Sequence, residues 1–245
     1  MKNGSILILG ARSEIGRQIA HQFASNGWHV LLAARSADSL LSDKLDLDIR
    51  YKIDVTLHEF NVLDVFTHYD FVNSLPILPD VAVCCVGMLG NQELGEKSSI
   101  ASIEVLRTNF EGPANILAIL ANKFEERGSG TLVGISSVAG ERGRASNYIY
   151  GSAKSGLTAF LSGLRNRLAH KGVNVLTVLP GFVETRMTEH IKLIKFLTTQ
   201  PNVVAKDVYN AVLMEKDTIY CLRVWRLIML IINFIPERFF KKMRL

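Results

Sequence analysis

The chain has 245 residues, of which 48% are hydrophobic and 18 are glycine, which suits one α/β domain and excludes a disordered chain. Its three cysteines do not make a disulfide framework, so a reducing cytoplasm is expected. The net charge of +5 comes from residues 223–245, which hold six Lys and Arg against one Glu, while the other 22 basic and 22 acidic residues cancel. This argues against a nucleic-acid-binding body and for a local anionic partner.

Apolar runs alternate with helical segments along most of the chain. We expect strands over 5–9, 29–34, 55–60, 81–86, 131–136, 173–179 and 218–221, with no signal sequence before the first. The segments between them read as helices, beginning with 14–26. This alternation predicts an α/β fold, a single Rossmann-like, doubly wound parallel sheet with helices on both faces. We place the domain at 1–221 and an apolar, basic tail helix at 222–245.

A glycine turn follows the first expected strand. Gly10 and Gly16 frame it, and glycine allows tight backbone geometry through which a pyrophosphate can approach the helix N-terminus. Glu14 would repel that pyrophosphate unless its side chain points to solvent. The alternative is an ordinary strand-to-helix turn. The candidate cofactor ligands in the turn are Gly10, Arg12, Ser13, Ile15 and Gly16.

The end of the second expected strand bears on the choice of cofactor. An acid there binds the ribose 2′-hydroxyl of NAD, whereas an Arg accommodates the 2′-phosphate of NADP. Ala34 stands in the acid's position and Arg35 follows it, with Arg12 available to join. We therefore expect NADP, with NAD as the alternative if Arg35 is only a solvated charge.

Tyr150 and Lys154 are four residues apart, which on a helix puts them on one face. A Tyr hydroxyl titrates near ~10, and a neighbouring cation favours the phenolate, so we expect Lys154 to lower the pKa of Tyr150. Ser137, thirteen residues before Tyr150, can donate to a substrate carbonyl oxygen while Tyr150 supplies the proton. Ser136 should face the other side of the strand end.

Asn109 lies in an expected helix over 100–126, four residues before Pro113. Proline has no N–H, so the carbonyl of Asn109 loses its helical partner and is free to hold a water. A merely kinked helix is the alternative.

The glycine turn, Asn109, Ser137, Tyr150 and Lys154 together resemble the short-chain dehydrogenase/reductase family, from about residue 5 to residue 185. The resemblance implies an NAD(P)-dependent oxidoreductase whose catalytic residues are Asn109, Ser137, Tyr150 and Lys154. It further implies that Lys154 binds the nicotinamide ribose and that a water links it to Asn109. Glu14 departs from the family pattern, which has a glycine there.

The same resemblance implies further cofactor contacts, at Asn61, Val62, Gly87, Pro180, Gly181, Val183 and Thr185. Cys84 and Cys85 precede Gly87, where the family has other small residues. We interpret them as buried strand residues rather than reactive thiols, and no metal-ligand spacing surrounds them.

Two segments are candidates for substrate contact. Arg142 and Arg144 lie between Ser137 and Tyr150, where they either hold a substrate phosphate or belong to a solvated loop. Residues 187–199 mix apolar residues with His190, Lys192 and Lys195, and form either a substrate lid or a surface helix.

Residues 224–235 are strongly apolar but too short to span a membrane, and a basic and aromatic cluster follows Pro236. This pattern predicts peripheral contact of residues 223–245 with the inner face of the membrane. A subunit-packing helix is the alternative, because the family usually forms homo-oligomers, which we also expect here.

A narrower likeness, to reductases of lipid-linked 2-keto sugars, appears in residues 87–90, 136–150 and 235–242. Three functions follow: reduction of a polyprenyl-phosphate keto sugar, reduction of a 3-oxoacyl or other lipophilic ketone, or a catalytically silent nucleotide-binding scaffold. The partners expected are a nicotinamide cofactor and a small or lipid-linked ketone.

Overall fold

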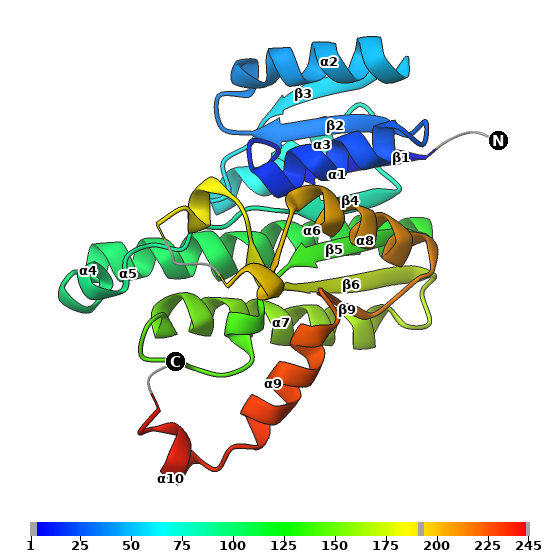
Figure 1. Cartoon of the computed structure of the whole chain (residues 1–245). Coiled ribbons are helices and arrows are strands. Elements are labelled where there is room, and N and C mark those ends of the chain that lie inside the picture. Colours follow the sequence, from blue (N-terminus) through cyan, green and yellow to red (C-terminus); the bar gives the residue numbers. More distant parts are fainter. Residues whose placement is uncertain (1–3, 191–193, 244–245) are drawn as a thin grey trace.

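A seven-stranded parallel sheet forms the centre of the computed structural model, which describes residues 4–190 and 194–243 (Figure 1). The strands are ordered β3-β2-β1-β4-β5-β6-β9. Their bounds are β1 Ser5–Leu9, β2 His29–Ala34, β3 Val55–Glu59, β4 Val81–Cys84, β5 Gly130–Ile135, β6 Val173–Pro180 and β9 Thr218–Cys221. The predicted doubly wound sheet is therefore confirmed, and each strand lies within two residues of its expected bounds.

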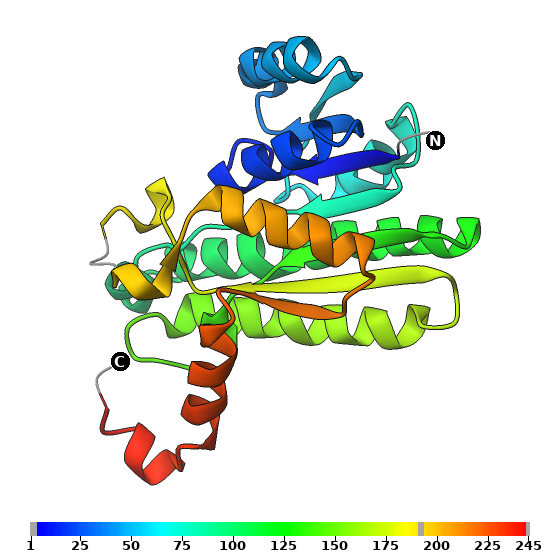
Figure 2. The same ribbon diagram turned by 45° about the vertical axis from the view of Figure 1, so that its right-hand side comes forward.

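Helices cover both faces of this sheet, as Figures 1 and 2 show. One face packs against α1 (Glu14–Ala24), α2 (Leu41–Tyr51) and α8 (Pro201–Leu213). The other packs against α3 (His68–Ser74), α6 (Gly112–Arg127) and α7 (Tyr148–Leu168). Two short helices, α4 (Gln92–Lys97) and α5 (Ser99–Leu106), lie beside α7.

The sequence of β1 shows why the sheet is covered on both faces. Ile6 and Ile8 point into the core on the α1 side, and Leu7 and Leu9 point into the core on the α6 side. All four side chains are fully buried, as expected for a strand between two helical layers. The strand order reverses between β1 and β4, so a crevice opens beyond their carboxyl ends.

The helix expected over 100–126 is interrupted. A π-helical turn over Arg107–Glu111 separates α5 from α6, and within it the N–H of Gly112 reaches back to the carbonyl of Arg107. Pro113 has no N–H to donate to the carbonyl of Asn109, so the regular α-helical hydrogen-bonding pattern is interrupted at this point.

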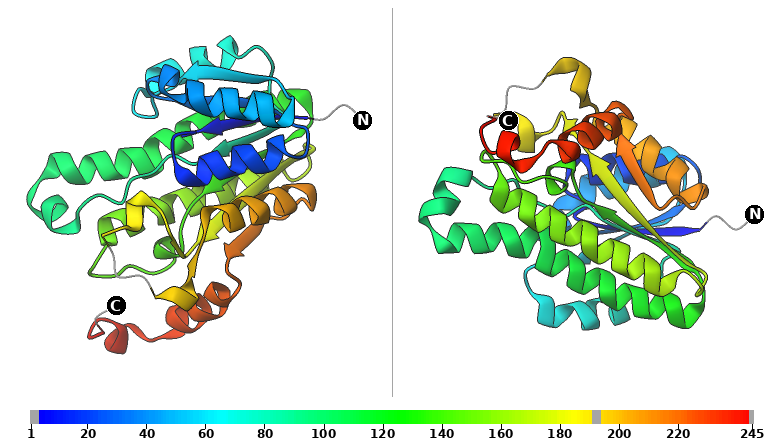
Figure 3. Two further views of the ribbon diagram at one scale, coloured as in Figure 1. Left: turned by 45° about the horizontal axis from the view of Figure 1, so that its top comes forward. Right: turned by 90° about the horizontal axis from the view of Figure 1, so that it is seen from below.

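The tail forms α9 (Val224–Phe234) and α10 (Glu237–Phe240), which project beyond the last strand (Figures 2 and 3). Trp225 and Met229 are buried against Val138 and Leu179 of the body, so α9 packs on the domain along one side. Arg244 lies outside the described residues. No helix in the described ranges has the length and hydropathy that crossing a membrane would require.

In the stretch 187–199, the described residues 187–190 and 194–199 do not form the surface helix that was one of its two interpretations. The chain here makes two 3-10 turns, Arg186–Thr188 and Lys195–Leu197, and then β8 (Thr198–Thr199), which pairs with β7 (Phe182–Val183). Lys192 lies outside the described residues, so the lid interpretation stays a prediction.

Arg142 ties the tail to the body. Its guanidinium donates to the carbonyls of Asn233 and Ile235, at 3.2 Å each, and to Glu237 Oε2 at 2.7 Å. It also lies 4.2 Å from the ring centroid of Phe240. This half-buried cation thus holds the end of α9 and the start of α10.

We predict that Arg142→Leu lowers the free energy of unfolding by about 1–3 kcal/mol, because it removes several hydrogen bonds from a charged group. Urea unfolding measures the change. Arg238→Leu is the control, since Arg238 is exposed and its guanidinium stacks on Phe239; it should change stability by less than about 0.5 kcal/mol. Equal effects of the two substitutions would contradict the anchoring role.

Candidate active site

The glycine turn between β1 and α1 is held in one conformation by its neighbours. Gly10 has φ +85°, and a Cβ there would lie 2.9 Å from the backbone N of Val86. The hydroxyl of Ser13 caps α1 by accepting from the N–H of Gly16 at 3.0 Å. The backbone N-terminus of α1 therefore faces the crevice, and such an end binds phosphate groups.

Beyond this turn lies a cleft of about 450 Å³. Its walls include six of the predicted cofactor ligands, Gly10, Arg12, Ser13, Arg35, Val62 and Gly87. An adjoining cleft of about 160 Å³ shares Gly87 and Met187 with it. This second cleft is lined by Ile15, Ser137, Tyr150, Lys154, Pro180, Gly181, Val183 and Thr185.

Two predicted ligands stand outside both linings. Gly16 lies behind the turn, where a Cβ would meet the carbonyl of Gly10 at 2.9 Å. Asn61 uses its Oδ1 to accept from the N–H of Leu63 at 3.1 Å, and its carbonyl contacts His68 Nε2 at 3.1 Å. Both residues instead make contacts within the turns to which they belong.

Arg12 and Arg35 lie together at the carboxyl end of β2. Arg12 donates to the carbonyl of Arg35 at 3.3 Å, and both side chains line the larger cleft. The nearby acid Glu59 accepts from the backbone N–H groups of Ser36 and Ala37, at 3.0 and 2.9 Å. These residues fit a phosphate-bearing ribose, because two cations face the cleft while the carboxylate is hydrogen-bonded to the chain.

The adjacent Cys84 and Cys85 are free, and Cys85 lines both clefts. Burial raises the pKa of Cys84 to about 11, and burial raises the pKa of Cys85 further. Thiols of this kind stay protonated and unreactive at neutral pH. In the described ranges, no group of three His, Cys, Asp or Glu is placed to bind a metal ion.

Asn109 is fully buried in the π-helical turn and holds the loop after β4. Its amide donates to the carbonyls of Met88 (2.7 Å) and Val105 (2.9 Å) and accepts from the N–H of Met88 (3.2 Å). A Cβ on Gly87 would lie 2.9 Å from Asn109 Oδ1 and 3.3 Å from Lys154 Nζ. Asn109, Gly87 and Lys154 are therefore in close contact.

Ser137 and Tyr150 face one another across the smaller cleft. Ser137 follows β5, its hydroxyl accepts from the N–H of Ala139 at 3.1 Å, and it hydrogen-bonds with Tyr150. Ser136 points the other way, into α7, where its hydroxyl contacts the carbonyl of Lys154 (3.0 Å) and Thr158 Oγ1 (2.6 Å). Both serines border the smaller cleft, but the hydroxyl of Ser137 meets Tyr150 whereas that of Ser136 is directed into α7, as the sequence predicted.

Lys154 is 3% exposed and donates from Nζ to the carbonyl of Ile135 at 2.9 Å. Burial lowers the pKa of Lys154 to about 8.

The expected effect of Lys154 on Tyr150 is not what the structure shows. Burial raises the pKa of Tyr150 to about 12, and the opposing contact is the hydrogen bond with Ser137. The reason is geometric, because Lys154 Nζ lies 5.8 Å from the ring centroid and donates to the backbone. Tyr150 is therefore protonated at neutral pH, ready to act as an acid.

The two candidate substrate arginines differ in position. The guanidinium of Arg142 binds the tail, as described above. Arg142 is therefore neither part of a free solvated loop nor positioned to bind a substrate phosphate, the two roles expected for it. Arg144 lines the smaller cleft and donates to Met229 Sδ at 3.5 Å. Among the described residues its buried Nε has no hydrogen-bond partner, and the same holds for Asn147 Oδ1 on the cleft wall.

The tail also contributes to this cleft, which was not predicted from the sequence. Trp225 lines it, donates from Nε1 to the carbonyl of Leu197 at 3.1 Å, and stacks edge-on against Phe182. A Cβ on Gly181 would lie 1.9 Å from Trp225 Nε1, so glycine is required where the two meet. The four-residue spacing of Trp225 and Met229 on an apolar helix was the available signal.

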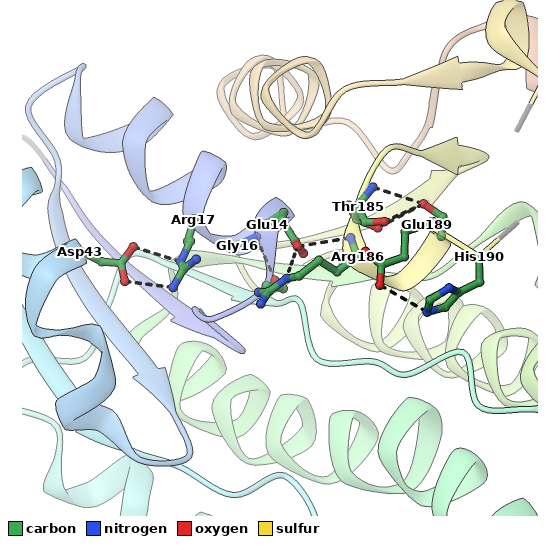
Figure 4. Close-up of polar contacts among 10 residues, drawn as sticks. Glu14, Gly16, Arg17, Asp43, Thr185, Arg186, Glu189 and His190 are labelled. Atoms are coloured by element: carbon green, nitrogen blue, oxygen red, sulfur yellow. Dashed lines mark hydrogen bonds and ion pairs between the residues drawn. The ribbon is translucent and has the colours of Figure 1, made fainter.

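Glu14 also has a partner that sequence reasoning did not identify. Its Oε1 accepts from Arg186 Nε at 2.6 Å (Figure 4), and both residues line the larger cleft. The carboxylate is therefore neither free in solvent nor unpaired beside the glycine turn.

Three comparisons with known proteins bear on this site. The family model described as short chain dehydrogenase matches residues 5–193. An uncharacterised oxidoreductase of Mycobacterium tuberculosis is 35% identical, over 97% of this chain and 96% of its own length.

Solved structures match the fold. A short-chain dehydrogenase from Sphingobium yanoikuyae in complex with NADPH superposes with a TM-score of 0.82 at 19% identity, over 96% of this chain and 97% of its own. The actinorhodin polyketide ketoreductase with NADPH gives 0.77 at 24% identity, over 89% and 95%.

Proposed function

The chain belongs to the short-chain dehydrogenase family, and we propose that it is an NADPH-dependent reductase of a ketone carried by a lipid. The specific substrate proposed is a polyprenyl-phosphate-linked keto sugar, reduced to the secondary alcohol.

Ser137, Tyr150 and Lys154 supply the chemistry of the protein in this proposal. Hydride for the carbonyl carbon would come from nicotinamide bound in the clefts. Tyr150 delivers its proton to the carbonyl oxygen, and its raised pKa keeps that proton in place until negative charge develops there. The Ser137 hydroxyl, next to Tyr150, donates a hydrogen bond to the same oxygen.

Lys154 and Asn109 would return a proton to Tyr150 after each turnover. The pKa of Lys154, about 8, lets the ammonium group exchange its proton near neutral pH. The carbonyl of Asn109 lacks the N–H of residue 113 as a partner and is suited to hold the relay water that the family resemblance implies.

Arg35 is the proposed reason for a preference for NADPH. It stands with Arg12 at the cleft, next to Ala34, which is buried and uncharged. Two structural neighbours are described with NADPH, which supports the same cofactor here. NAD is the alternative.

One observation carries the proposed substrate class: α9 has one face against the cleft and the opposite face in solvent. Trp225 lines the cleft and Met229 is buried beside Arg144. On the outer face four apolar side chains recur at helical spacing and are more than half exposed, namely Leu227, Leu230, Ile231 and Phe234. A helix of this kind can lie in a membrane interface while its inner face guides a lipid-linked ketone to the cleft.

The charges of the tail support the same proposal. Five cations of the tail are exposed, namely Arg223, Arg226, Arg238, Lys241 and Lys242. Cations near an anionic membrane surface contribute about 1 kcal/mol each to binding. We therefore propose that the protein acts at the inner face of the membrane.

Sequence similarity in three segments, and polar groups on the wall of the smaller cleft, support the more specific proposal of a keto sugar linked to a lipid phosphate. Residues 87–90, 136–150 and 235–242 resemble the reductase component of decaprenylphosphoryl-ribose 2-epimerase. Two of these segments join in this chain, through Arg142 and Glu237. Arg144 Nε and Asn147 Oδ1 offer a donor and an acceptor on the cleft wall for a polar, anionic head.

A second candidate is reduction of a 3-oxoacyl thioester or another lipophilic ketone. The fold match to a polyketide ketoreductase favours it, and an acyl chain would fit beside Trp225 and Phe182. Dependence of turnover on lipid or detergent separates the two, since a thioester on a carrier protein does not need a membrane. A silent scaffold, the third alternative, would bind NADPH and reduce none of these ketones.

We predict that Tyr150→Phe lowers turnover at least tenfold and leaves NADPH affinity within twofold, because general acid catalysis contributes about 10²–10⁴-fold. Steady-state reduction and a binding titration measure both. Tyr148→Phe is the matched control, since Tyr148 is exposed and has no Lys four residues later. A Tyr150→Phe enzyme with more than a tenth of the normal rate would contradict the role.

For the cofactor, we expect the unmodified protein to bind NADPH more tightly than NADH. Arg35→Ala should reduce that ratio about tenfold or more, because a hydrogen bond to a charged group is worth about 1.5–3 kcal/mol. Arg50→Ala, which removes a surface cation from α2, is the control. Preference for NADH, or an unchanged ratio, would show that Arg35 does not select the cofactor.

For the tail, we predict that the protein cosediments with phosphatidylglycerol vesicles and that high salt weakens this. The triple variant Leu227→Gln, Leu230→Gln, Phe234→Gln should release it, whereas the control Ile49→Gln, Phe66→Gln, also at exposed apolar positions, should not. Point variants are preferable to truncation because Trp225 lines the cleft. If the unmodified protein ignores vesicles at low salt, α9 instead packs against another subunit.

A further inference from the structure

The ion pair of Glu14 and Arg186 joins two sides of the larger cleft. Glu14 is the first residue of α1, and Arg186 begins the 3-10 turn after β7. Glu14 Oε1 accepts from Arg186 Nε at 2.6 Å and from the backbone N–H of Arg186 at 3.3 Å. Figure 4 shows the two side chains pointing toward one another from α1 and from the turn that contains Arg186.

Glu14 places a carboxylate where the helix attracts anions. The first turn of α1 directs unpaired N–H groups toward the cleft, and Ser13 caps one of them. Burial tends to raise the pKa of Glu14, but the hydrogen bond with Arg186 leads the contacts that lower it overall, so Glu14 is ionised at neutral pH. An ionised carboxylate at this end of a helix resembles a bound phosphate in charge and position.

Arg186 lies mostly in solvent. Its side chain is 70% exposed, and within the described ranges Glu14 is its only ion-pair partner. Arg17, on the same helix, is engaged elsewhere, with Asp43 at 3.0 Å on the α2 side. Arg186 and Arg12 are the cations that line the cleft near the glycine turn, and Arg12 is directed to Arg35.

We propose that Arg186 is the cationic ligand of the cofactor diphosphate, and that Glu14 occupies its guanidinium until the cofactor binds. This inference rests on the proposed dinucleotide-dependent function. When the cofactor binds, its diphosphate replaces the Glu14 carboxylate as the partner of Arg186. In this exchange Arg186 always has an anionic partner. Glu14 thereby weakens cofactor binding in two ways, by competing for Arg186 and by repelling the diphosphate.

The diphosphate and the 2′-phosphate of the cofactor would thus be recognised by different residues. Arg35 should distinguish NADPH from NADH, whereas Glu14 and Arg186 should affect every ligand that carries the diphosphate. ADP-ribose has this group and no nicotinamide, so its binding reports the diphosphate contact without turnover.

Calorimetric titration of the full chain with ADP-ribose and with NADPH tests the proposal. Glu14→Gln should tighten both ligands about fivefold, and Arg186→Gln should weaken both about tenfold. In the Arg186→Gln background the gain from Glu14→Gln should shrink, because no cation remains to be released. Arg17→Gln is the matched control, since it removes a cation from α1 that is paired outside the cleft, and it should change affinity less than twofold.

The outcomes distinguish this proposal from the proposed function. Unchanged ADP-ribose affinity in Arg186→Gln, or weaker affinity in Glu14→Gln, would overturn the exchange and identify the pair as a structural clamp. If the affinities change as expected but no ketone is reduced, the proposed function fails and the exchange stands. If the unmodified chain binds neither ligand, both are overturned. Thermal unfolding of each variant without ligand checks that the fold is intact.

Discussion

The burial of the Lys154 ammonium group is the constraint on which the catalytic side of the molecule depends. A cation removed from water costs several kcal/mol unless hydrogen bonds and nearby dipoles compensate. Here the carbonyl of Ile135, at the end of β5, accepts a hydrogen bond from the ammonium group, and a Cβ on Gly87 would lie 3.3 Å from its Nζ. Only a glycine fits at 87, because a side chain there would collide with Asn109. The end of one strand, a loop and a π-helical turn therefore meet at one ammonium group, which places Tyr150, four residues away on α7, at the cleft.

The tail is part of the same arrangement. Arg142 precedes α7 and binds the end of α9, while Trp225 at the other end of α9 closes over Gly181. One wall of the smaller cleft is therefore α9, which has an apolar side chain facing the cleft and other apolar side chains facing solvent. Because α9 has apolar groups on both sides and the tail carries exposed cations, we propose that the ketone is carried by a lipid.

Much of this architecture was predictable from the sequence. The strands of a parallel sheet buried on both faces are continuous apolar runs, and the one at 5–9 is confirmed to the residue. Helical periodicity was enough to place Tyr150 and Lys154 on one face. Pairings between distant residues were not predictable, because nothing local indicates that Arg142 meets residues 233–237 or that Glu14 meets Arg186. The pKa of Tyr150 was expected to fall and rises instead, because proximity in sequence does not reveal burial or the direction of the Lys154 ammonium group.

The central claim is that a nicotinamide hydride reaches a carbonyl carbon held beside Ser137 and Tyr150. Single-turnover mixing of the protein with NADPH deuterated at the transferable C4 position, and with a panel of lipid-phosphate keto sugars and 3-oxoacyl thioesters, tests it directly. The account predicts that mass spectrometry finds a secondary alcohol with one deuterium on the carbinol carbon from at least one ketone. NADPH that binds to the folded protein and keeps its deuterium in the presence of every ketone would contradict the account.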